Sequence, residues 1–191
     1  MIDVIMPCSG DSKHLKESIS SILNQTYEDF TFHIVVNCTD NKTLKIINSY
    51  DDCRIKVHKT SICQLSFSVN YILNIVSSEY IARMDSDDIA LPNKFEKQIN
   101  YLNKHGDIDV LGTQIYEHNG KSFTPILRFP LKNSDIRKKI WFKTVFSHPT
   151  VLIRRSAVIG IGGYMAGKSQ DLDLWLRLSR NNDINFAHLD M

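Results

Sequence analysis

The chain contains the stretch Tyr80-Ile81-Ala82-Arg83-Met84-Asp85-Ser86-Asp87-Asp88, in which a short apolar segment typical of a buried strand is followed by three carboxylates within four positions. Carboxylates this close repel one another, and burying them costs several kcal/mol unless a positive charge neutralises them. A divalent metal is the simplest such charge, since Mg²⁺ and Mn²⁺ prefer oxygen ligands and Mg²⁺ is often held by one or two carboxylates together with substrate phosphates. The alternative is a solvated acidic turn that caps the next helix.

The segments around this stretch alternate between two apolar patterns. Strands are expected at residues 2–6, 32–36, 54–58, 80–84 and 109–116, the first of them stopped by Pro7. Between them lie segments with helical spacing of apolar residues, for example Leu65, Val69, Ile72 and Val76. This alternation predicts an α/β fold with a mostly parallel central sheet and helices on both faces. In such sheets ligands bind beyond the carboxyl ends of the strands, which is where the three acids lie.

Composition sets the broad class of the protein. The 191 residues, with 42% hydrophobic and 23% charged residues, suit a single globular domain. A formal net charge of +2 gives no footprint for nucleic acid, so no nucleic-acid partner is expected. No signal peptide and no apolar run of ~20 residues is visible. The four cysteines match no zinc pattern or disulfide framework, which predicts reduced thiols in a cytoplasmic protein.

Six short motifs follow one another along the chain. They are Val4-Ile5-Met6-Pro7, Ser21-Ile22-Leu23-Asn24-Gln25-Thr26-Tyr27, the acidic stretch followed by Leu91-Pro92, His148-Pro149-Thr150, Gly162-Gly163-Tyr164, and Asp171-Leu172-Asp173-Leu174-Trp175-Leu176-Arg177. In this order the chain resembles a bacterial family 2 glycosyltransferase with the GT-A fold, over nearly all 191 residues. The resemblance implies inverting transfer of a sugar from a nucleotide sugar, a UDP-sugar, to an acceptor hydroxyl in polysaccharide or lipopolysaccharide biosynthesis.

The resemblance also implies an internal organisation. Residues 1–116 would form the nucleotide-sugar-binding half of a single domain, and residues 117–191 the smaller acceptor-side half. The second half is less regular, with a helix expected around 136–142, a strand at 150–154, a flexible glycine-rich connection at 160–163 and a helix at 171–178. Members of the family usually continue past this last helix, so a chain truncated at its C-terminal end is expected.

By position in the motifs, three acids receive roles. Asp87 would bind Mn²⁺ or Mg²⁺, and Asp85 would help through the ribose or the metal shell, so that the metal bridges the donor diphosphate and stabilises its charge. Asp171 would accept the proton of the acceptor hydroxyl as general base. The alternative for Asp171 is an acid placed at a helix N-terminus by the helix dipole. Asp173 is expected to support the helix surface instead of acting as the base.

The same resemblance implies that seven residues bind the nucleotide sugar. They are Pro7, Ser9, Asn37, Asn70, Arg83, Asp85 and Ser86. Pro7 could equally be a strand terminator, Asn70 a polar residue on a helix surface, and Arg83 one half of a structural ion pair. His148 could line the acceptor cleft or be a satisfied core histidine.

Two positions depart from the family pattern. After the second strand the family has an acidic residue and a glycine that grip the base or ribose, whereas here the order is Asn37-Cys38-Thr39-Asp40. Asn37 can still bond the edge of uracil, because its side chain both donates and accepts. After Pro7, Ser9 and Gly10 replace the usual aromatic residue and asparagine.

Other functions remain open at this stage. A sugar nucleotidyltransferase would need a glycine-rich phosphate loop with a lysine, and residues 7–12 contain one glycine. A non-catalytic nucleotide-sugar-binding domain is a further alternative. A lipid-linked acceptor would call for peripheral contact with the inner face of the cytoplasmic membrane. The segment from Lys138 to Lys143, which includes Trp141 and Phe142, has the basic and aromatic character for it. The alternative there is a helix that docks Trp141 into the core.

Overall fold

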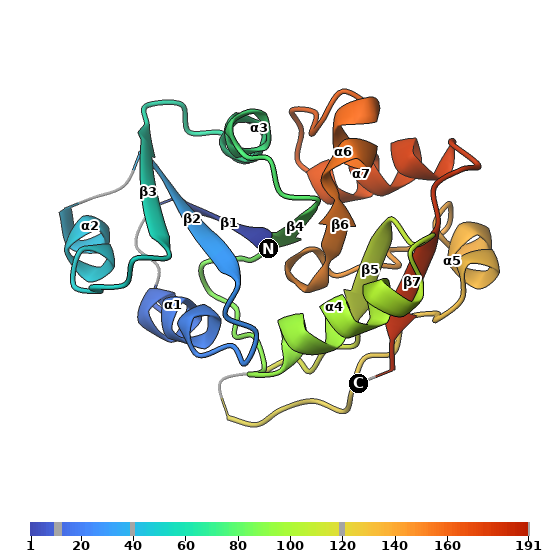
Figure 1. Ribbon diagram of the computed structural model, residues 1–191, viewed down its shortest axis with the longest axis horizontal. Coiled ribbons are helices and arrows are strands. Elements are labelled where there is room, and N and C mark those ends of the chain that lie inside the picture. The colour runs from blue at the N-terminus through green and yellow to red at the C-terminus, as the bar shows by residue number, and fades with distance from the viewer. Residues whose placement is uncertain (10–12, 39–40, 119–120, 191) are drawn as a thin grey trace.

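The structure is a computed structural model that describes residues 1–9, 13–38, 41–118 and 121–190 (Figure 1). One seven-stranded sheet runs through the described part of the chain in the order β3-β2-β1-β4-β6-β5-β7. The strands are β1 (Ile2–Ser9), β2 (Phe30–Asn37), β3 (Ile55–Thr60), β4 (Tyr80–Arg83), β5 (Val110–Thr113), β6 (Leu152–Arg154) and β7 (Phe186–Leu189). The helices are α1 (Leu15–Leu23), α2 (Asn41–Ile47), α3 (Leu65–Ile75), α4 (Lys94–Lys104), α5 (Asn133–Lys139), the 3₁₀ turn His148–Thr150, α6 (Arg155–Gly160) and α7 (Gln170–Ser179).

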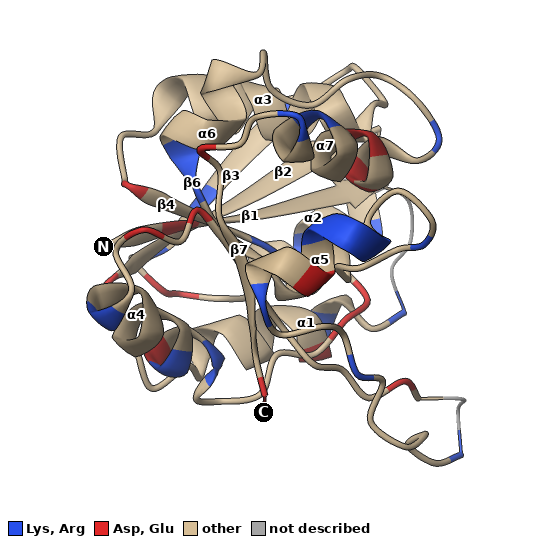
Figure 2. Ribbon diagram, turned by 90° about the vertical axis from the view of Figure 1, so that its right-hand side faces the viewer, with Lys and Arg blue, Asp and Glu red and all other residues tan. Residues whose placement is uncertain are grey.

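The sheet is mostly parallel and is covered on both faces, which confirms the predicted α/β class. Strands β3, β2, β1 and β4 run parallel, as do β5 and β7, while β6 is antiparallel to both of its neighbours. Helices α1, α2 and α4 pack on one face, and α3, α5, α6 and α7 pack on the other (Figures 1 and 2). Within β1, Val4 and Met6 face the first layer and Ile5 faces the second.

Strand β1 continues through Pro7 to Ser9, so the prediction that Pro7 stops it was wrong. Pro7 lies opposite Val35 in the parallel pair with β2. Because Ile5 accepts a bond from Met84 on the β4 side, the backbone of Pro7, two residues on, points to the same side. The ladder with β4 ends at Ile5, so the N–H that proline lacks has no ladder bond to make there.

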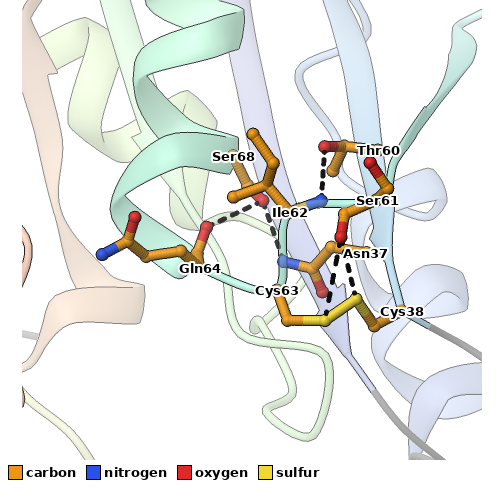
Figure 3. The surroundings of a disulfide bond; sticks show 8 residues. All are labelled: Asn37, Cys38, Thr60, Ser61, Ile62, Cys63, Gln64 and Ser68. Carbon is orange, nitrogen blue, oxygen red and sulfur yellow. Dashed lines mark hydrogen bonds between the residues drawn. A yellow bond between two sulfur atoms is a disulfide. The ribbon is translucent and has the colours of Figure 1, made fainter.

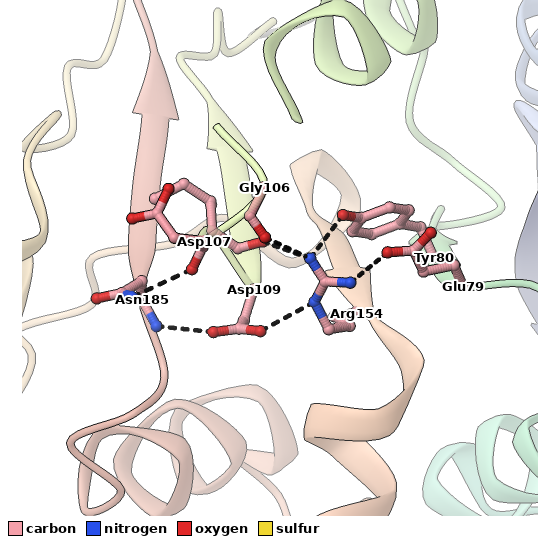
Figure 4. Close-up of polar contacts among 8 residues, drawn as sticks. Glu79, Tyr80, Gly106, Asp107, Asp109, Arg154 and Asn185 are labelled. Carbon is pink, nitrogen blue, oxygen red and sulfur yellow. Dashed lines mark hydrogen bonds and ion pairs between the residues drawn. The ribbon is translucent and has the colours of Figure 1, made fainter. Parts of the chain in front are cut away.

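Helix α6, the 3₁₀ turn and strand β7 were absent from the sequence prediction, and strands β5 and β6 are shorter than expected. Helix α6 occupies part of the segment predicted as a flexible connection, and β7 adds an edge strand beside β5, which itself covers only Val110–Thr113. The half-buried Arg154, the last residue of β6, ties this antiparallel strand to its neighbours beside the start of β4 (Figure 4). Arg154 donates to Asp109 (3.0 Å), to the Tyr80 hydroxyl (2.8 Å) and to Glu79, while Asp109 accepts from the backbone of Asn185 just before β7.

The prediction of reduced thiols was wrong for one pair of cysteines. Cys38 and Cys63 form a disulfide with their Cα atoms 5.6 Å apart, whereas Cys8 and Cys53 are free thiols (Figure 3). The reason is topological, because β2 and β3 pair in register up to Asn37 and so bring the segments that follow them together. The expectation of a cytoplasmic location loses the support that it drew from reduced thiols.

Parts of two predicted loops lie outside the described residues. They are the loop after β1, with Gly10 and residues 11–12, and the turn after β2, with Thr39 and Asp40. None of the helices in the described ranges is both long enough and apolar enough to cross a membrane.

Candidate active site

The three carboxylates follow β4 on a turn that α1 holds against the sheet. Ser18 Oγ donates to the backbone carbonyl of Asp85 (2.8 Å), and Gln25 Nε2 donates to the carbonyl of Leu91 (2.8 Å). The Ser21-to-Tyr27 motif of the sequence therefore has a physical role, because it belongs to the helix end that fixes the acid turn. We call residues 85–88 the acid turn below.

A buried arginine and the acid turn form an ion pair. Arg83 is 2% exposed, and its Nη2 lies 2.5 Å from Oδ1 of Asp85, whose side chain is one-third exposed. The structure thus gives Arg83 the ion pair that the sequence left open as an alternative to phosphate binding. The Asp87 side chain is exposed, and Ser86 hydrogen-bonds the buried thiol of Cys8 at the end of β1.

The electrostatics of the acid turn indicate excess negative charge. Desolvation, followed by the charges of Asp85 and Asp87, raises the pKa of the Asp88 carboxyl to about 6, although the residue as a whole is exposed. Lys94, which is 5% exposed, donates to the backbone carbonyl of Pro149 (2.5 Å). Burial lowers the pKa of its ammonium group to about 8, and Asp88 and Asp85 oppose that shift. Lys94 thus offsets part of the charge of the turn and ties it to the 3₁₀ turn.

The buried Tyr164 is affected by the charges of Asp85, on the acid turn, and of Asp171, at the start of α7. Its hydroxyl is 2.9 Å from Nε2 of His148, and the two rings stack. Burial raises the pKa of Tyr164, with Asp171 and Asp85 adding to the rise and Arg83 opposing it. Burial, together with the charge of Arg83, lowers the pKa of His148 well below its usual range, so that histidine is neutral and hydrogen-bonded. The charges of Asp85 and Asp171 therefore both act on the polar centre that Tyr164 and His148 form.

Asn70 holds the glycine-rich segment that carries Tyr164. Its Nδ2 donates to the carbonyl of Tyr164 (2.8 Å), and its Oδ1 accepts from the backbone N–H of Tyr164 (2.9 Å). Gly163 has a φ of +76°, and a Cβ at that position would lie 2.6 Å from Oδ1 of Asn70. Asn70, expected among the residues that bind the nucleotide sugar, thus makes both of these bonds to the protein backbone.

Helix α7 presents Asp171 in its first turn. Its buried residues are Leu174, Trp175, Leu178 and Ser179. Asp173 pairs with Arg177 (Nε to Oδ2, 2.8 Å), and Arg177 donates to the carbonyls of Ile161 (2.9 Å) and Gly163 (2.8 Å). Asp173 therefore lies in a supporting network that ties α7 to the glycine-rich segment, in line with its expected role.

The carboxyl ends of β1 and β2 form the neighbouring part of the site. Ser9 lies opposite Asn37 in the parallel register, two residues beyond Pro7. Asn37 is 2% exposed and donates from Nδ2 to Ser68 Oγ (2.9 Å) (Figure 3). Its Oδ1 is buried and finds no partner among the residues that the structure describes. A buried acceptor without a partner is costly, which suits an atom that meets a ligand.

The residues fit a divalent metal only if a substrate supplies the remaining ligands. Asp85 and Asp87 provide oxygen donors, and the pKa of Asp88 is raised by burial and by the negative charges of these two acids, which a cation would offset. Within the described ranges, no three His, Cys, Asp or Glu side chains converge to hold an ion by themselves. Mg²⁺-type sites are often completed by water and substrate phosphates, so this donor set is compatible with such a site.

Comparison with known proteins supplies the family. The family model for glycosyl transferase family 2 matches residues 3–162. The chain belongs to glycosyl transferase family 2. Its relatives within the family include the O-antigen biosynthesis glycosyltransferase WbnJ of Escherichia coli, which is 40% identical over 185 residues, or 93% of this chain and 71% of WbnJ. Two further relatives are each matched over 66% of their length, so the chain spans about two thirds of the curated relatives it matches.

Solved structures show the same fold. Staphylococcus aureus TarS in complex with UDP-GlcNAc superposes with a TM-score of 0.82 at 20% identity, covering 99% of this chain and 56% of that one. A mannosyltransferase from Pyrobaculum calidifontis in complex with GDP-Man and Mn²⁺ gives a TM-score of 0.74 at 12% identity, covering 99% and 54%. These similarities confirm the GT-A fold that the sequence predicted.

Sequence reasoning missed two polar residues of this centre. Lys94 shares the buried stripe of α4 with Phe95, Gln98 and Leu102. The spacing of these residues places Lys94 on the buried side of the helix, but a lysine is rarely buried, so residue type alone predicts an exposed side chain. Tyr164 was noted only as part of a motif, because nothing local predicts its bond to His148, 16 residues away.

Proposed function

We propose that this chain is the donor-binding and catalytic domain of an inverting, metal-dependent glycosyltransferase. It would move a sugar from a UDP-sugar to an acceptor hydroxyl during assembly of a surface polysaccharide. The observation that carries the proposal is the placement of two acids, Asp85 on the turn after β4 and Asp171 in the first turn of α7, whose charges both act on the buried Tyr164. One of these carboxylates sits on a turn suited to a metal and a diphosphate, and the other at the start of a helix in the second half of the chain.

The reaction needs one group to accept a proton. The acceptor oxygen bonds to the anomeric carbon while the bond from that carbon to the diphosphate oxygen breaks, and a single displacement inverts the configuration. Asp171 takes the proton of the acceptor hydroxyl, which typically contributes ~10²–10⁴-fold to the rate. Asp85 and Asp87 would hold Mn²⁺ or Mg²⁺, which supplies neutralisation of the charge that develops on the diphosphate.

Recognition of the uracil base would fall to the ends of β1 and β2. The partnerless Oδ1 of Asn37 suits the imide N–H of uracil, and Pro7 and Ser9 lie on the adjacent strand. Ser86 and Arg83 would act near the ribose and phosphates, Arg83 through its hold on Asp85. Asn70 would contribute by keeping Tyr164 in place.

Support for the pathway comes from relatives. WbnJ is named for O-antigen biosynthesis, and a TarS structure holds UDP-GlcNAc. The two alternatives, a sugar nucleotidyltransferase and a non-catalytic binding domain, predict different outcomes in an activity assay. The former would release pyrophosphate when it joins a sugar phosphate to a nucleoside triphosphate, and the latter would bind a UDP-sugar without turnover.

Calorimetric titration with UDP tests the metal and nucleotide parts of the proposal. We expect Mn²⁺ to strengthen UDP binding to the wild type and to Asp51→Ala, an exposed acid outside the site, but not to Asp87→Ala. Unfolding temperatures of the variants should match, because exposed acids contribute little packing. Equal UDP affinity with and without Mn²⁺ in the wild type would contradict the proposal. Release of UDP from UDP-sugars then separates an enzyme from a binding domain.

A further inference from the structure

We propose that the end of α5 is a docking surface for an anionic lipid bilayer. The surface, which we call the basic-aromatic patch, consists of Lys138, Lys139, Trp141, Phe142, Lys143 and Arg180. The patch lies at the end of α5, which is in front of the sheet in the view of Figure 2. It takes no part in the polar centre around Tyr164, so the inference does not depend on the proposed reaction.

Two large aromatic side chains of the patch are exposed. Trp141 is 52% and Phe142 is 88% exposed, the latter the highest value among the exposed large hydrophobic residues of the described chain. The alternative in which Trp141 docks into the core was therefore wrong. The reason is that the core positions of this segment are taken by Ile136 and Ile140, which are 0% and 1% exposed.

Hydrogen bonds connect the helix that carries the patch to the end of α7 and to the segment that follows it. Arg137, on α5, donates to the carbonyls of Ser179 (2.8 Å), the last residue of α7, and of Asn181 (2.8 Å) and Ile184, which follow that helix. The guanidinium carbon of Arg180 lies 5.9 Å from the centroid of the Trp141 ring. The aromatic side chains are therefore presented by elements that are bonded to one another and to the core.

The charge around the aromatic pair matches an anionic surface. Residues 133–144 and 180–183 together contain five Lys or Arg and two acids, Asp135 and Asp183. Trp is enriched at membrane–water interfaces, and basic residues near an anionic leaflet each add to binding. Lysine, by contrast, is depleted at protein–protein interfaces. A surface with three lysines around an exposed Trp-Phe pair thus suits a bilayer better than a protein partner.

The position of the patch relates it to the catalytic end of α7. Asp171 and Arg180 lie at opposite ends of this helix, nine residues apart, which corresponds to about 14 Å at the helical rise. Binding through the patch would therefore keep Asp171 within about one helix length of the bilayer surface. That arrangement suits an acceptor whose hydroxyl stands at a short distance above the lipid headgroups.

Vesicle binding of the wild-type chain tests the inference. We expect it to co-sediment with vesicles of equal parts phosphatidylcholine and phosphatidylglycerol, but not with phosphatidylcholine alone. Trp175 is fully buried, so a blue shift of tryptophan emission on vesicle addition would report on Trp141. Retention on both vesicle types alike, or on neither, would overturn the proposal.

Variants separate the aromatic and charge contributions. Trp141→Ala with Phe142→Ala should abolish co-sedimentation, whereas Phe123→Ala, which removes another exposed aromatic side chain (71%), should bind as the wild type does. Lys138→Gln with Lys139→Gln should weaken binding roughly 25-fold, about fivefold for each charge. Unfolding temperatures near that of the wild type confirm that the variants fold. Binding of the Trp141 and Phe142 variant at wild-type strength would refute the patch as the docking surface.

Discussion

Substitution of Gly163 by alanine tests whether the Asn70–Tyr164 contact organises the site. Gly163 and its neighbour Gly162 both have left-handed backbones, with φ of +76° and +83°. A Cβ on Gly163 would lie 2.6 Å from Oδ1 of Asn70, whereas a Cβ on Gly162 meets nothing within 4 Å. An alanine at either position therefore has an unfavourable backbone conformation, but only an alanine at position 163 also clashes with Asn70.

The magnitudes follow from these contacts. The left-handed backbone costs an alanine about 1–2 kcal/mol at either position. At Gly163, the Asn70 side chain must also move, which breaks its two hydrogen bonds to Tyr164 at about 1 kcal/mol each. We therefore expect Gly163→Ala to lower the free energy of unfolding by about 3–4 kcal/mol and Gly162→Ala by about 1–2 kcal/mol.

Chemical denaturation of both variants measures this difference. A second comparison uses an Asn70→Ala background, which removes the side chain that clashes with the new Cβ. There Gly163→Ala should cost about as much as Gly162→Ala, because only the backbone strain remains. Equal losses for Gly163→Ala and Gly162→Ala in the wild-type background would refute the reasoning.

Two further predictions concern stability. Burial lowers the pKa of His188 to about 4, so the unfolded chain takes up its proton first as pH falls. His188 alone should thus lower the unfolding free energy by up to about 3 kcal/mol between pH 6.5 and 4, so the drop should be smaller in His188→Asn, as denaturant titrations at several pH values would reveal. Reduction of the Cys38–Cys63 disulfide, which spans 25 residues, should cost about 3 kcal/mol, and Cys63→Ser should remove the response of the unfolding transition to reductant. A flat pH profile, or a transition insensitive to reductant in the wild type, would contradict these expectations.

Local pattern was enough to predict the strands and helices that bury regular apolar stripes. Strands β2 and β4 and helices α1, α3 and α7 lie close to where their spacing puts them. The same approach failed at Pro7, because whether a proline ends a strand depends on where the neighbouring strand stops. It also missed β7, a four-residue edge strand whose partner β5 lies more than seventy residues earlier in the chain.

The candidate site was likewise predicted in part from local sequence. The acids at 85, 87 and 171 stand out by residue type and motif, and the charges of Asp85 and Asp171 both contribute to the raised pKa of Tyr164. What local sequence does not contain is the set of long-range bonds that shape the site around these acids. These are the bond of Lys94 to Pro149, the disulfide of Cys38, and the Asn70 contacts across 94 residues.

Turnover of UDP-sugars by Asp171→Asn and Asp173→Asn tests the central claim most directly. The measurement is release of UDP from UDP-GlcNAc, UDP-glucose and UDP-galactose in Mn²⁺, with UDP affinity determined for each variant. Water can serve as the acceptor in this assay, so no specific acceptor is needed. We predict that Asp171→Asn lowers the rate by ~10²–10⁴-fold with UDP affinity unchanged, while Asp173→Asn, which perturbs only the pair with Arg177, loses far less. A wild-type rate for Asp171→Asn, or no UDP release by the wild-type chain from any donor, would contradict the account.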